Sequence, residues 1–449
     1  MNRWTSRYQI SCGQEAERFK SIERLVSSLK LSGREPEAEF GLFQSAMKNT
    51  FLCSAQDKKI LLTFLALAKC HAMIHFPSES AFVKGINARS PWGNEMNPAI
   101  IFTGLAGTGK TELLRALGRL LGESSSFDVP GHGCLPLVPA WFLSLIAGPG
   151  LNEALSQWIE QPSDILNSKK IEEEKKKPVS FGRLLDLARR ISFRDGVCLL
   201  PADEFQFVTT SSNANALATR VLLQLLSIGP RLLYAANYSL VHRLQARNQE
   251  DRQRLLVHRI HLMPESFCCA DGVRLLAAYF DILPDDFNLD AANVGQQIQD
   301  YTYGIKRFAV LLLALAWVRA KSHRGHRAKV STDDFRWAYL CSDYSDSRDD
   351  VVTLQRQDIS RKKIKEGLWD PFYSEQEDNV VTLTPAIEAF EKRVEDKRLD
   401  SFLTPIERIG FEALKKSREP PTKGPKVVQL GRGKRSKQDL ADALNMMDE

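Results

Sequence analysis

The sequence predicts an α/β fold in which a parallel β-sheet is flanked by helices, with further helical regions before and after the sheet. Between residues 99 and 265, short apolar runs alternate with helical segments, which is typical of parallel strands joined through helices. The runs are largely apolar along their length, as expected for strands that are buried on both faces. Outside this region, apolar residues recur at three- and four-residue spacing, which indicates helices.

The composition is that of a globular protein without a membrane segment or a secretion signal. The chain has 449 residues, of which 43% are hydrophobic and 26% charged, and this length suffices for two or three domains. No apolar run is long enough to span a membrane, and the first residues lack the continuous apolar segment of a secretory signal. The eight cysteines are scattered without metal-ligand spacing, which favours reduced thiols and a cytoplasmic location.

Two segments precede the sheet. Residues 1–75 carry apolar residues at helical spacing, so we expect a helical N-terminal extension. Residues 76–98 gather Pro, Gly, Ser and Asn, which is typical of a connector. The predicted strands of the α/β core, residues 99–265, are 99–103, 134–138, 197–200, 231–236 and 259–263.

The C-terminal part divides into a helical region and a basic tail. Residues 266–345 read as a compact group of helices, one of which is expected to start at Ser331 or Thr332 with Asp334 in its first turn. Apolar residues become sparse over 346–449, which predicts an extended, largely disordered tail that binds partners. Residues 415–437 hold nine Lys/Arg against one Glu, or +8, so the rest of the chain carries about −2 of the net +6.

A glycine-rich stretch follows the first predicted strand. Residues 104–111, GLAGTGKT, fit the phosphate-binding loop G-x-x-x-x-G-K-[ST], and a helical pattern follows directly. Glycines let backbone amides curl around phosphate oxygens, and the helix N-terminus adds unpaired amides and the positive end of its dipole. Lys110 is expected to reach the β- and γ-phosphates of a nucleoside triphosphate, and the Thr111 hydroxyl to bind Mg²⁺.

A pair of acids follows the third predicted strand. Asp203 would hold Mg²⁺ through its water shell, and Glu204 would polarise the attacking water, a task for a carboxylate near the metal but not bound to it. The alternative is a surface acidic pair after a buried strand. Pro201 stands just before the acids, and because proline is poorly tolerated inside a central strand, we expect the strand to end at Leu200.

Polar residues after the later strands are further candidates. Asn237 could contact the γ-phosphate or position water, or it could simply form a turn. Arg252 and Arg254 lie before the last strand and could reach a neighbouring subunit's phosphates, or they could belong to a solvated basic helix face. Arg307 stands three residues after Gly304, where a guanidinium could swing onto the phosphates. Lys306 competes with Arg307 for this role, and a packing or surface role for either stays open.

This order of features resembles an AAA+ ATPase with its helical lid. Within that superfamily, "PADEFQF", "LLYAANYSL", "HRIHLMPE" and "YTYGIKRFAVLLLALAWVRA" resemble the TnsC/TniB group, the ATP-dependent regulators of bacterial DNA transposition. The resemblance covers residues 99–345 and makes residues 266–345 the lid. It implies a catalytic set of Lys110, Glu204, Asn237 and Arg307, to which the position before the last strand adds Arg252 and Arg254 as candidates. It also implies an ATP–Mg²⁺ site made of Gly104, Ala106, Gly107, Thr108, Gly109, Lys110, Thr111, Glu112 and Arg307, with Thr111 and Asp203 on the metal.

The same resemblance implies partners. ATP-bound subunits would assemble on double-stranded DNA in a bacterial cytoplasm, as a ring or as a helical filament of about six to seven subunits per turn. The assembly would connect a target-selection protein to the transposase subunits, which the basic tail would contact, and hydrolysis would dissolve it. No membrane is expected to be involved.

Two other functions share the nucleotide residues. A replication initiator or helicase loader of the AAA+ type would usually carry a helix-turn-helix domain after the lid, for which residues 350–449 are poor in core residues. A switch NTPase in signalling or defence would act without DNA.

Overall fold

A computed structural model describes residues 2–11, 13–88, 90–93, 97–129, 131–144, 181–203 and 214–373. Residues Met1–Tyr373 belong to one compact unit. The predicted basic stretch 415–437 and the rest of the tail beyond residue 373 lie outside the described residues.

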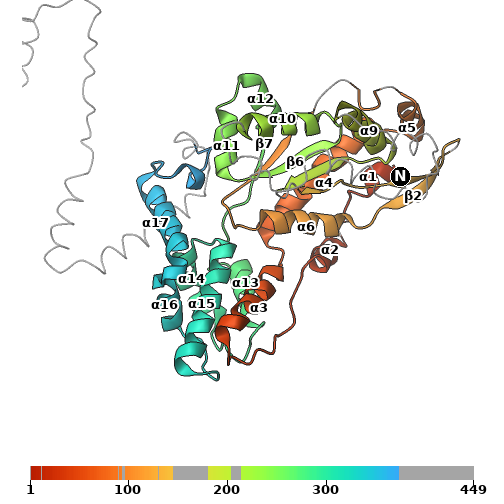
Figure 1. Cartoon of the computed structure of the whole chain (residues 1–449). Helices are drawn as coiled ribbons and strands as arrows, with labels where there is room; N and C mark the ends of the chain where they lie inside the picture. The colour runs from red at the N-terminus through yellow and green to blue at the C-terminus, as the bar shows by residue number, and fades with distance from the viewer. Residues whose placement is uncertain are drawn as a thin grey trace, which may run out of the picture. The chain divides into compact units, whose positions relative to one another are not determined.

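A parallel β-sheet forms the centre of the α/β core, with helices on both faces (Figure 1), so the predicted fold class is confirmed. The five strands follow the order β4-β5-β6-β1-β7. The central strand β1 is buried along its whole length, and its Ile100 lies opposite Leu233 of β6 and His258 of β7. The strands are β1 (Ile100–Thr103), β4 (Leu143–Ser144), β5 (Leu199–Asp203), β6 (Arg231–Ala236) and β7 (His258–His261).

Strand β5 runs past the proline that was expected to end it. The sequence predicts a strand over residues 197–200, whereas β5 continues through Pro201 to Asp203. Pro201 lies opposite Leu233 of β6, and the neighbour on the other side, β4, pairs only with Ala202 and Asp203. On the same side Ala140 forms an isolated bridge with Leu199, so Pro201, which has no N–H to donate, lies in a gap between two pairings. As a result, Asp203 is the last residue of the strand.

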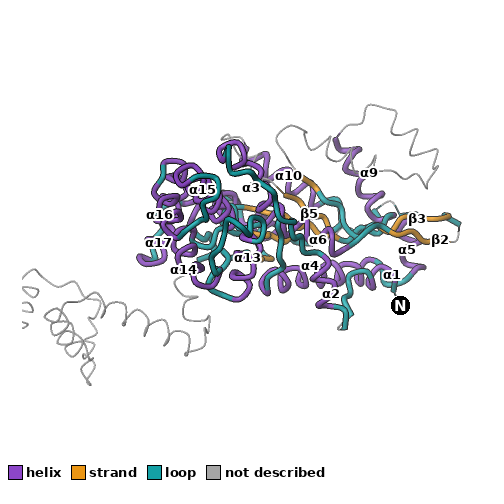
Figure 2. The backbone as a smooth tube through the Cα atoms, turned by 90° about the horizontal axis from the view of Figure 1, so that it is seen from below, coloured by secondary structure: helices purple, strands orange, loops and turns teal. Residues whose placement is uncertain are grey.

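The predicted strand over residues 134–138 does not join the parallel sheet, which corrects the sequence-based prediction. β2 (Ser125–Val129) and β3 (Gly133–Leu137) form a separate antiparallel hairpin, visible at the right of Figure 2. Gly131 and Gly133 have φ angles of 78° and 74°, which suit glycine near a tight turn. Burial alternates along both strands, so this ribbon buries one face and is unlike a strand that is covered on both faces.

Helices from different parts of the sequence cover the two faces of the sheet. On one face, α4 and α6 pack against Ile100 and Phe102. On the other face, α9, α10, α11 and α12 pack against Ile101 and Tyr234. α4 is therefore a layer of the core, although the sequence assigns it to an N-terminal extension. The helices up to β7 are α1 (Arg3–Ser6), α2 (Glu15–Ser21), α3 (Pro36–Asn49), α4 (Ala55–His75), α5 (Glu79–Ile86), α6 (Lys110–Leu121), α9 (Phe181–Arg194), α10 (Ala214–Leu226), α11 (Tyr238–Gln245) and α12 (Gln249–Leu255).

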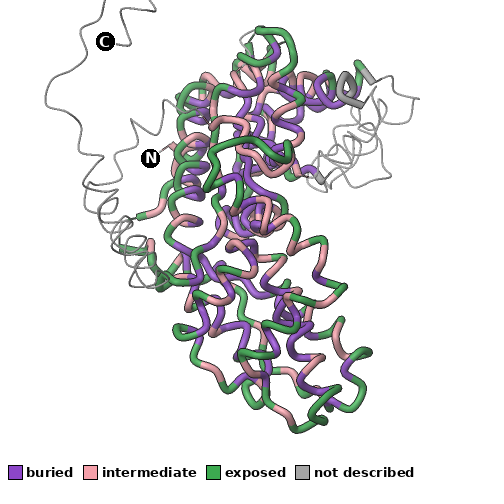
Figure 3. Tube along the Cα trace, turned by 90° about the vertical axis from the view of Figure 1, so that its left-hand side faces the viewer, coloured by how far each residue is buried: buried purple, intermediate pink, exposed green. Residues whose placement is uncertain are grey.

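The helices of the lid have a buried core of their own, to which α3 from the N-terminal region contributes. Figure 3 shows how buried residues are distributed along the backbone. The ring of Phe43 on α3 packs in tilted orientations against the rings of Phe287 and Trp317, with centroid distances of 5.6 and 5.9 Å. Met47 of α3 is also fully buried in this cluster. The remaining helices are α13 (Ala270–Phe280), α14 (Ala291–Thr302), α15 (Lys306–Arg324), α16 (Thr332–Leu340) and α17 (Ser345–Ser360), with the short 3-10 turns η2 (Ser342–Tyr344) and η3 (Glu366–Leu368).

The chain remains folded beyond residue 345, which corrects the predicted boundary between lid and tail. α17 begins at Ser345 and buries Val351 and Leu354. Leu354 packs with Leu105 and Tyr238 of the α/β core and with Ile305 at the start of the lid helix α15. The segment of residues 361–373, here called the strap, then returns to the α/β core. The backbone oxygen of Trp369 lies 3.0 Å from His242 Nε2 of α11, and Arg259 lies over the Phe372 ring at 4.1 Å from its centroid. Asp370 also pairs with His261, and Gln245 donates to the Pro371 oxygen, so the contacts of the strap are both polar and apolar.

Among the described helices, none taken alone is long and apolar enough to cross a membrane, and two bent pairs meet that test only when taken together.

Candidate functional site

The glycine-rich loop joins β1 to α6 in the way that the motif requires. Gly109 is the N-cap of α6 and has φ 109°, and Gly107 has φ 88°. Both values lie in the left-handed region, where glycine is favoured because it lacks a Cβ. The loop therefore presents backbone amides and the N-terminus of α6 at the carboxyl edge of the sheet, an arrangement that suits a bound anion.

Lys110 is the buried cation of this loop. Its Nζ donates to the backbone oxygens of Gly104 and Leu105, each at 2.8 Å, and its residue is 9% exposed. Burial lowers the pKa of Lys110 to about 7, Asp203 partly opposes this lowering, and Arg307 adds to it. Carbonyl oxygens are weak partners for an ammonium group, so a phosphate would be a stronger one.

The adjacent strands β5 and β6 bring two more predicted residues to the same edge. Asp203 ends β5, and Asn237 follows β6 as the N-cap of α11. β6 lies between β5 and β1 in the sheet, so the ends of all three strands are close together. Both side chains line the same cavity as Lys110.

The lid closes this cavity from the other side. The backbone N–H of Arg307, in the first turn of α15, donates to the Gly107 oxygen at 3.1 Å. Arg307 is exposed and its side chain lines the cavity. A Cβ built at Gly107 would lie 2.7 Å from Arg307 Cβ, so glycine is required here for the approach of the lid as well as for its φ angle.

The cavity has a volume of about 560 Å³ and gathers most of the predicted site residues. They are Ala106, Gly107, Gly109, Lys110, Thr111, Glu112, Asp203, Asn237 and Arg307.

The remaining predicted residues are placed differently. Gly104 directly follows β1, and a Cβ built there would lie 2.4 Å from the Leu262 oxygen. The Thr108 hydroxyl donates to the Leu105 oxygen at 2.9 Å. Arg252 and Arg254 lie on α12, away from this cavity, and Arg254 pairs with Glu250. Their suggested action on a neighbouring subunit stays a prediction. Glu204 lies outside the described residues, so its role also stays a prediction.

The sequence did not reveal the N-terminal share of the cavity wall. Residues 47–52 line it together with Asp57, and the lid adds Leu275, Tyr279 and Val310. The one local signal is Ser54 followed three residues later by Asp57, which form a capping box at the start of α4. That pattern predicts a helix start and does not show that the helix begins at a binding site.

The donor groups fit a nucleoside triphosphate with Mg²⁺. The loop offers positive-φ glycines, a helix N-terminus and a buried ammonium, which are the groups that cradle phosphates. The Thr111 hydroxyl and the Asp203 carboxylate line the same cavity, and hydroxyl and carboxylate oxygens are the ligands that Mg²⁺ prefers. The apolar part of the wall, with Leu52 and Val310, suits a flat base.

The topology and the loop together define an α/β P-loop fold. No protein-family model matches the sequence, and no curated protein does. The structure is similar to three solved structures at low scores, all at sequence identities of 14–17%.

The first is Cdc6p from Pyrobaculum aerophilum, at 14% identity and a TM-score of 0.36, over 58% of this chain and 64% of that one. The second is the Aeropyrum pernix ORC1 protein in complex with DNA, at 17% identity and a TM-score of 0.35, over 63% and 72%. The third comes from a study of katanin self-assembly, at 15% identity and a TM-score of 0.36, over 74% and 92%. Because these scores are low, the fold is assigned from the sheet order and the phosphate loop.

Proposed function

We propose that this chain is an AAA+ ATPase that binds ATP and Mg²⁺ in the cavity at the carboxyl edge of the sheet. One observation carries the proposal. Lys110, Asp203 and Arg307 are far apart in the sequence, yet they line one cavity beside a glycine-rich loop. These three groups have the charges and positions that phosphoryl transfer needs, because catalysis there consists mainly of positioning and charge stabilisation.

Each residue would have a separate task. The loop amides, Lys110 and Arg307 would hold the phosphates, and Thr111 and Asp203 would hold Mg²⁺, which neutralises charge on the phosphate oxygens when bound. Asn237 would orient the water. Glu204 would accept its proton, as the sequence pattern suggests.

Nucleotide binding and turnover test this assignment separately. Lys110→Ala should weaken ATP binding by at least about tenfold, because the loop loses its charge-assisted hydrogen bond to phosphate. Glu204→Gln should retain ATP but stop hydrolysis. Lys84→Ala is a control for binding, since Lys84 is exposed on α5 and does not line the cavity. If Lys110→Ala bound a fluorescent ATP analogue as tightly as the unaltered chain, the cavity would not be the ATP site.

We further propose that ATP-bound copies assemble on double-stranded DNA and connect a target-selection protein to a transposase, in the manner of the TnsC/TniB group. The support is the resemblance of the stretches around Asp203, Asn237, His258 and Arg307, together with the basic stretch 415–437. Arg252, which is exposed on α12, would act on a neighbour's phosphates in such an assembly.

Electron microscopy with duplex DNA and a non-hydrolysable ATP analogue tests the assembly. Rings or filaments that require both are expected, and monodisperse monomers at micromolar concentration would contradict the proposal. Capture of the transposase by the full chain, and its loss after deletion of residues 374–449, would support the transposition role. Capture of a replicative helicase would favour the helicase-loader alternative, and ATPase activity without any response to DNA would favour the switch NTPase.

A further inference from the structure

A buried ionic cluster lies next to the nucleotide cavity and has no role in the mechanism described so far. Lys306, the first residue of α15, has its Nζ 3.2 Å from Glu265 Oε2 and 3.9 Å from Asp57 Oδ2. Glu265 is 8% exposed and Asp57 is 1% exposed. Two carboxylates therefore share one ammonium group. The three groups come from three different segments of the chain: α4, the link from β7 to the lid, and α15.

Backbone contacts hold the carboxylate of Asp57 and the main chain of Glu265 in place. Asp57 Oδ2 accepts from the Ser54 N–H at 3.2 Å within the capping box of α4. The Glu265 N–H donates to the Gly304 oxygen at 2.9 Å, and a Cβ at Gly304 would lie 1.9 Å from the Glu265 oxygen, so only glycine fits. Of the three groups, the ammonium has the longest flexible stem.

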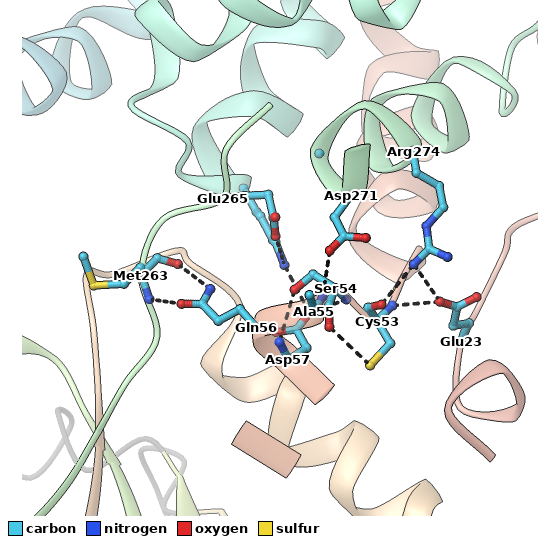
Figure 4. Close-up of polar contacts among 12 residues, drawn as sticks. Glu23, Cys53, Ser54, Ala55, Gln56, Asp57, Met263, Glu265, Asp271 and Arg274 are labelled. Carbon is cyan, nitrogen blue, oxygen red and sulfur yellow. Dashed lines mark hydrogen bonds and ion pairs between the residues drawn. The ribbon is translucent and has the colours of Figure 1, made fainter. Parts of the chain in front are cut away.

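The start of α4 is joined by further bonds to the lid and to the link between β7 and the lid, as Figure 4 shows. The Ala55 N–H donates to Asp271 of α13 at 2.7 Å. Gln56 accepts from the Met263 N–H at 3.0 Å and donates to the Met263 oxygen at 3.2 Å. These bonds fix the start of α4, and with it Asp57, relative to the lid.

The ammonium is also within reach of the phosphate loop. A Cβ built at Gly109 would lie 3.9 Å from Lys306 Nζ and 3.5 Å from its Cδ. Lys306, Asp57 and Gly109 all line the nucleotide cavity. Burial on its own lowers the pKa of Lys306, but the two carboxylates outweigh this effect and hold that pKa above its ordinary value. Lys306 is thus a cation at neutral pH.

We propose that Lys306 is a second lid-borne ligand for the nucleotide's phosphates, and that Asp57 and Glu265 compete with the phosphates for it. This inference rests on the proposed function of the cavity. Gly109 belongs to the part of the loop whose amides cradle the α- and β-phosphates, so Lys306 would serve ADP as well as ATP. The two carboxylates then set the affinity for polyphosphate, and the start of α4 becomes part of the nucleotide site.

Competition predicts effects of opposite sign. Lys306→Met should weaken binding of a non-hydrolysable ATP analogue and of ADP by about tenfold, as expected for the loss of a charge-assisted hydrogen bond. Glu265→Gln should tighten binding of both several-fold, because it removes a competitor and leaves the lysine in place. Adenosine, measured by competition, should bind all variants equally, since it has no phosphate.

A matched control lies on the same helix. Lys321 of α15 is 4% exposed and its Nζ pairs with Asp286. Asp286→Asn therefore breaks a pair of the buried Lys321 with a half-buried carboxylate, away from the nucleotide cavity. It should lower the melting temperature without changing nucleotide affinity.

The outcomes separate this inference from the proposed function. If the unaltered chain bound ATP but Glu265→Gln bound it no more tightly, the competition would be refuted and the ATPase assignment would stand. If the unaltered chain bound no nucleotide, both would be refuted. The Glu265→Gln measurement decides the matter even if Lys306→Met does not fold, because Glu265→Gln leaves the cation present.

Discussion

Gly107 is the residue at which the phosphate loop and the lid come closest. Its φ is 88°, and a Cβ there would lie 2.7 Å from Arg307 Cβ and 3.1 Å from Ile305 Cγ2. The backbone bond from Arg307 to the Gly107 oxygen depends on this approach. One glycine therefore serves both the curvature of the loop and the closure of the lid.

We expect Gly107→Ala to weaken ATP binding and to lower the melting temperature. The positive φ alone should cost about 1–2 kcal/mol, and the contact with Arg307 adds to it. Gly133→Ala is the control, because Gly133 also has a positive φ, 74°, but no atom within 4 Å of its Cβ position. Thermal unfolding and nucleotide titration of the two variants separate crowding from backbone strain. Equal losses in both would show that the lid does not press on Gly107.

Lys110 makes nucleotide affinity depend on pH. Burial, countered in part by Asp203, sets the pKa of Lys110 at about 7 in the nucleotide-free site. Bound phosphate favours the charged form, so the pKa rises on binding. Below pH 7 the amine of Lys110 is already protonated. Above pH 7 the amine must take up a proton when the nucleotide binds. Affinity for an ATP analogue should therefore fall by up to about tenfold per pH unit above pH 7, and titrations from pH 6 to 9 check this. A flat profile would mean that Lys110 is charged throughout.

One buried glutamine holds the turn between α17 and η3 through its side-chain hydrogen bonds. Gln357 is 3% exposed, its Oε1 accepts from the Ile364 and Lys365 N–H groups, and its Nε2 donates to the Leu368 oxygen. The turn that it shapes exposes several cations, which are Arg356, Arg361, Lys362, Lys363 and Lys365. Lys363 pairs with Glu366 and Lys365 with Asp350.

If the protein binds duplex DNA as proposed, this turn should contribute to binding. Arg361→Gln with Lys362→Gln should weaken DNA binding at low salt and reduce the slope of log affinity against log salt by about 0.9 for each phosphate that the protein no longer neutralises. Lys59→Gln removes one positive charge from an exposed position on α4 and is the control for loss of charge elsewhere on the surface. Fluorescence anisotropy with a DNA duplex over a range of salt concentrations measures both. An unchanged slope would place the DNA elsewhere.

At the scale of the whole molecule, the α/β core and the lid are joined in three ways. The link around Glu265 connects the two parts along the chain. In the N-terminal region, α3 packs in the lid and α4 packs on the α/β core. The strap returns from the lid to α11 and β7. The cluster of Leu105, Tyr238, Ile305 and Leu354 also brings the phosphate loop, α11 and the lid into contact. Changes at the nucleotide cavity can therefore reach both parts.

A truncation series tests how far the folded unit extends. A chain that ends at Tyr373 should unfold at the same temperature as the full chain and keep its nucleotide affinity, because the compact unit ends there. A chain that ends at Ser360 loses the strap and should melt several degrees lower, since the contacts of Trp369 and Phe372 are removed. Calorimetry measures both. Equal melting temperatures for the two chains would show that the strap adds no stability.

Much of the site could be predicted because its signals are local. The loop around Lys110, the acid after a buried strand, the polar residue after the next strand and the basic residue after Gly304 each stand out within a few residues. The carboxyl ends of parallel strands meet at one edge of the sheet, which explains why Asp203 and Asn237, each identified from its own local pattern, line the same cavity. The capping box of α16 likewise confirms the predicted start and selects Ser331 over Thr332 as the N-cap.

The sequence by itself determined the α/β class, the phosphate loop and the order of the site residues, because these depend on short-range patterns of glycine, charge and apolar spacing. Only the tertiary structure decided that residues 134–138 belong to a hairpin, that β5 passes through Pro201, that α17 and the strap are folded, and that Asp57 meets Lys306. Each of these depends on which distant segments share a face or an edge. Such pairings are set by the burial and charge of both partners at once, and neither partner's own sequence contains that information.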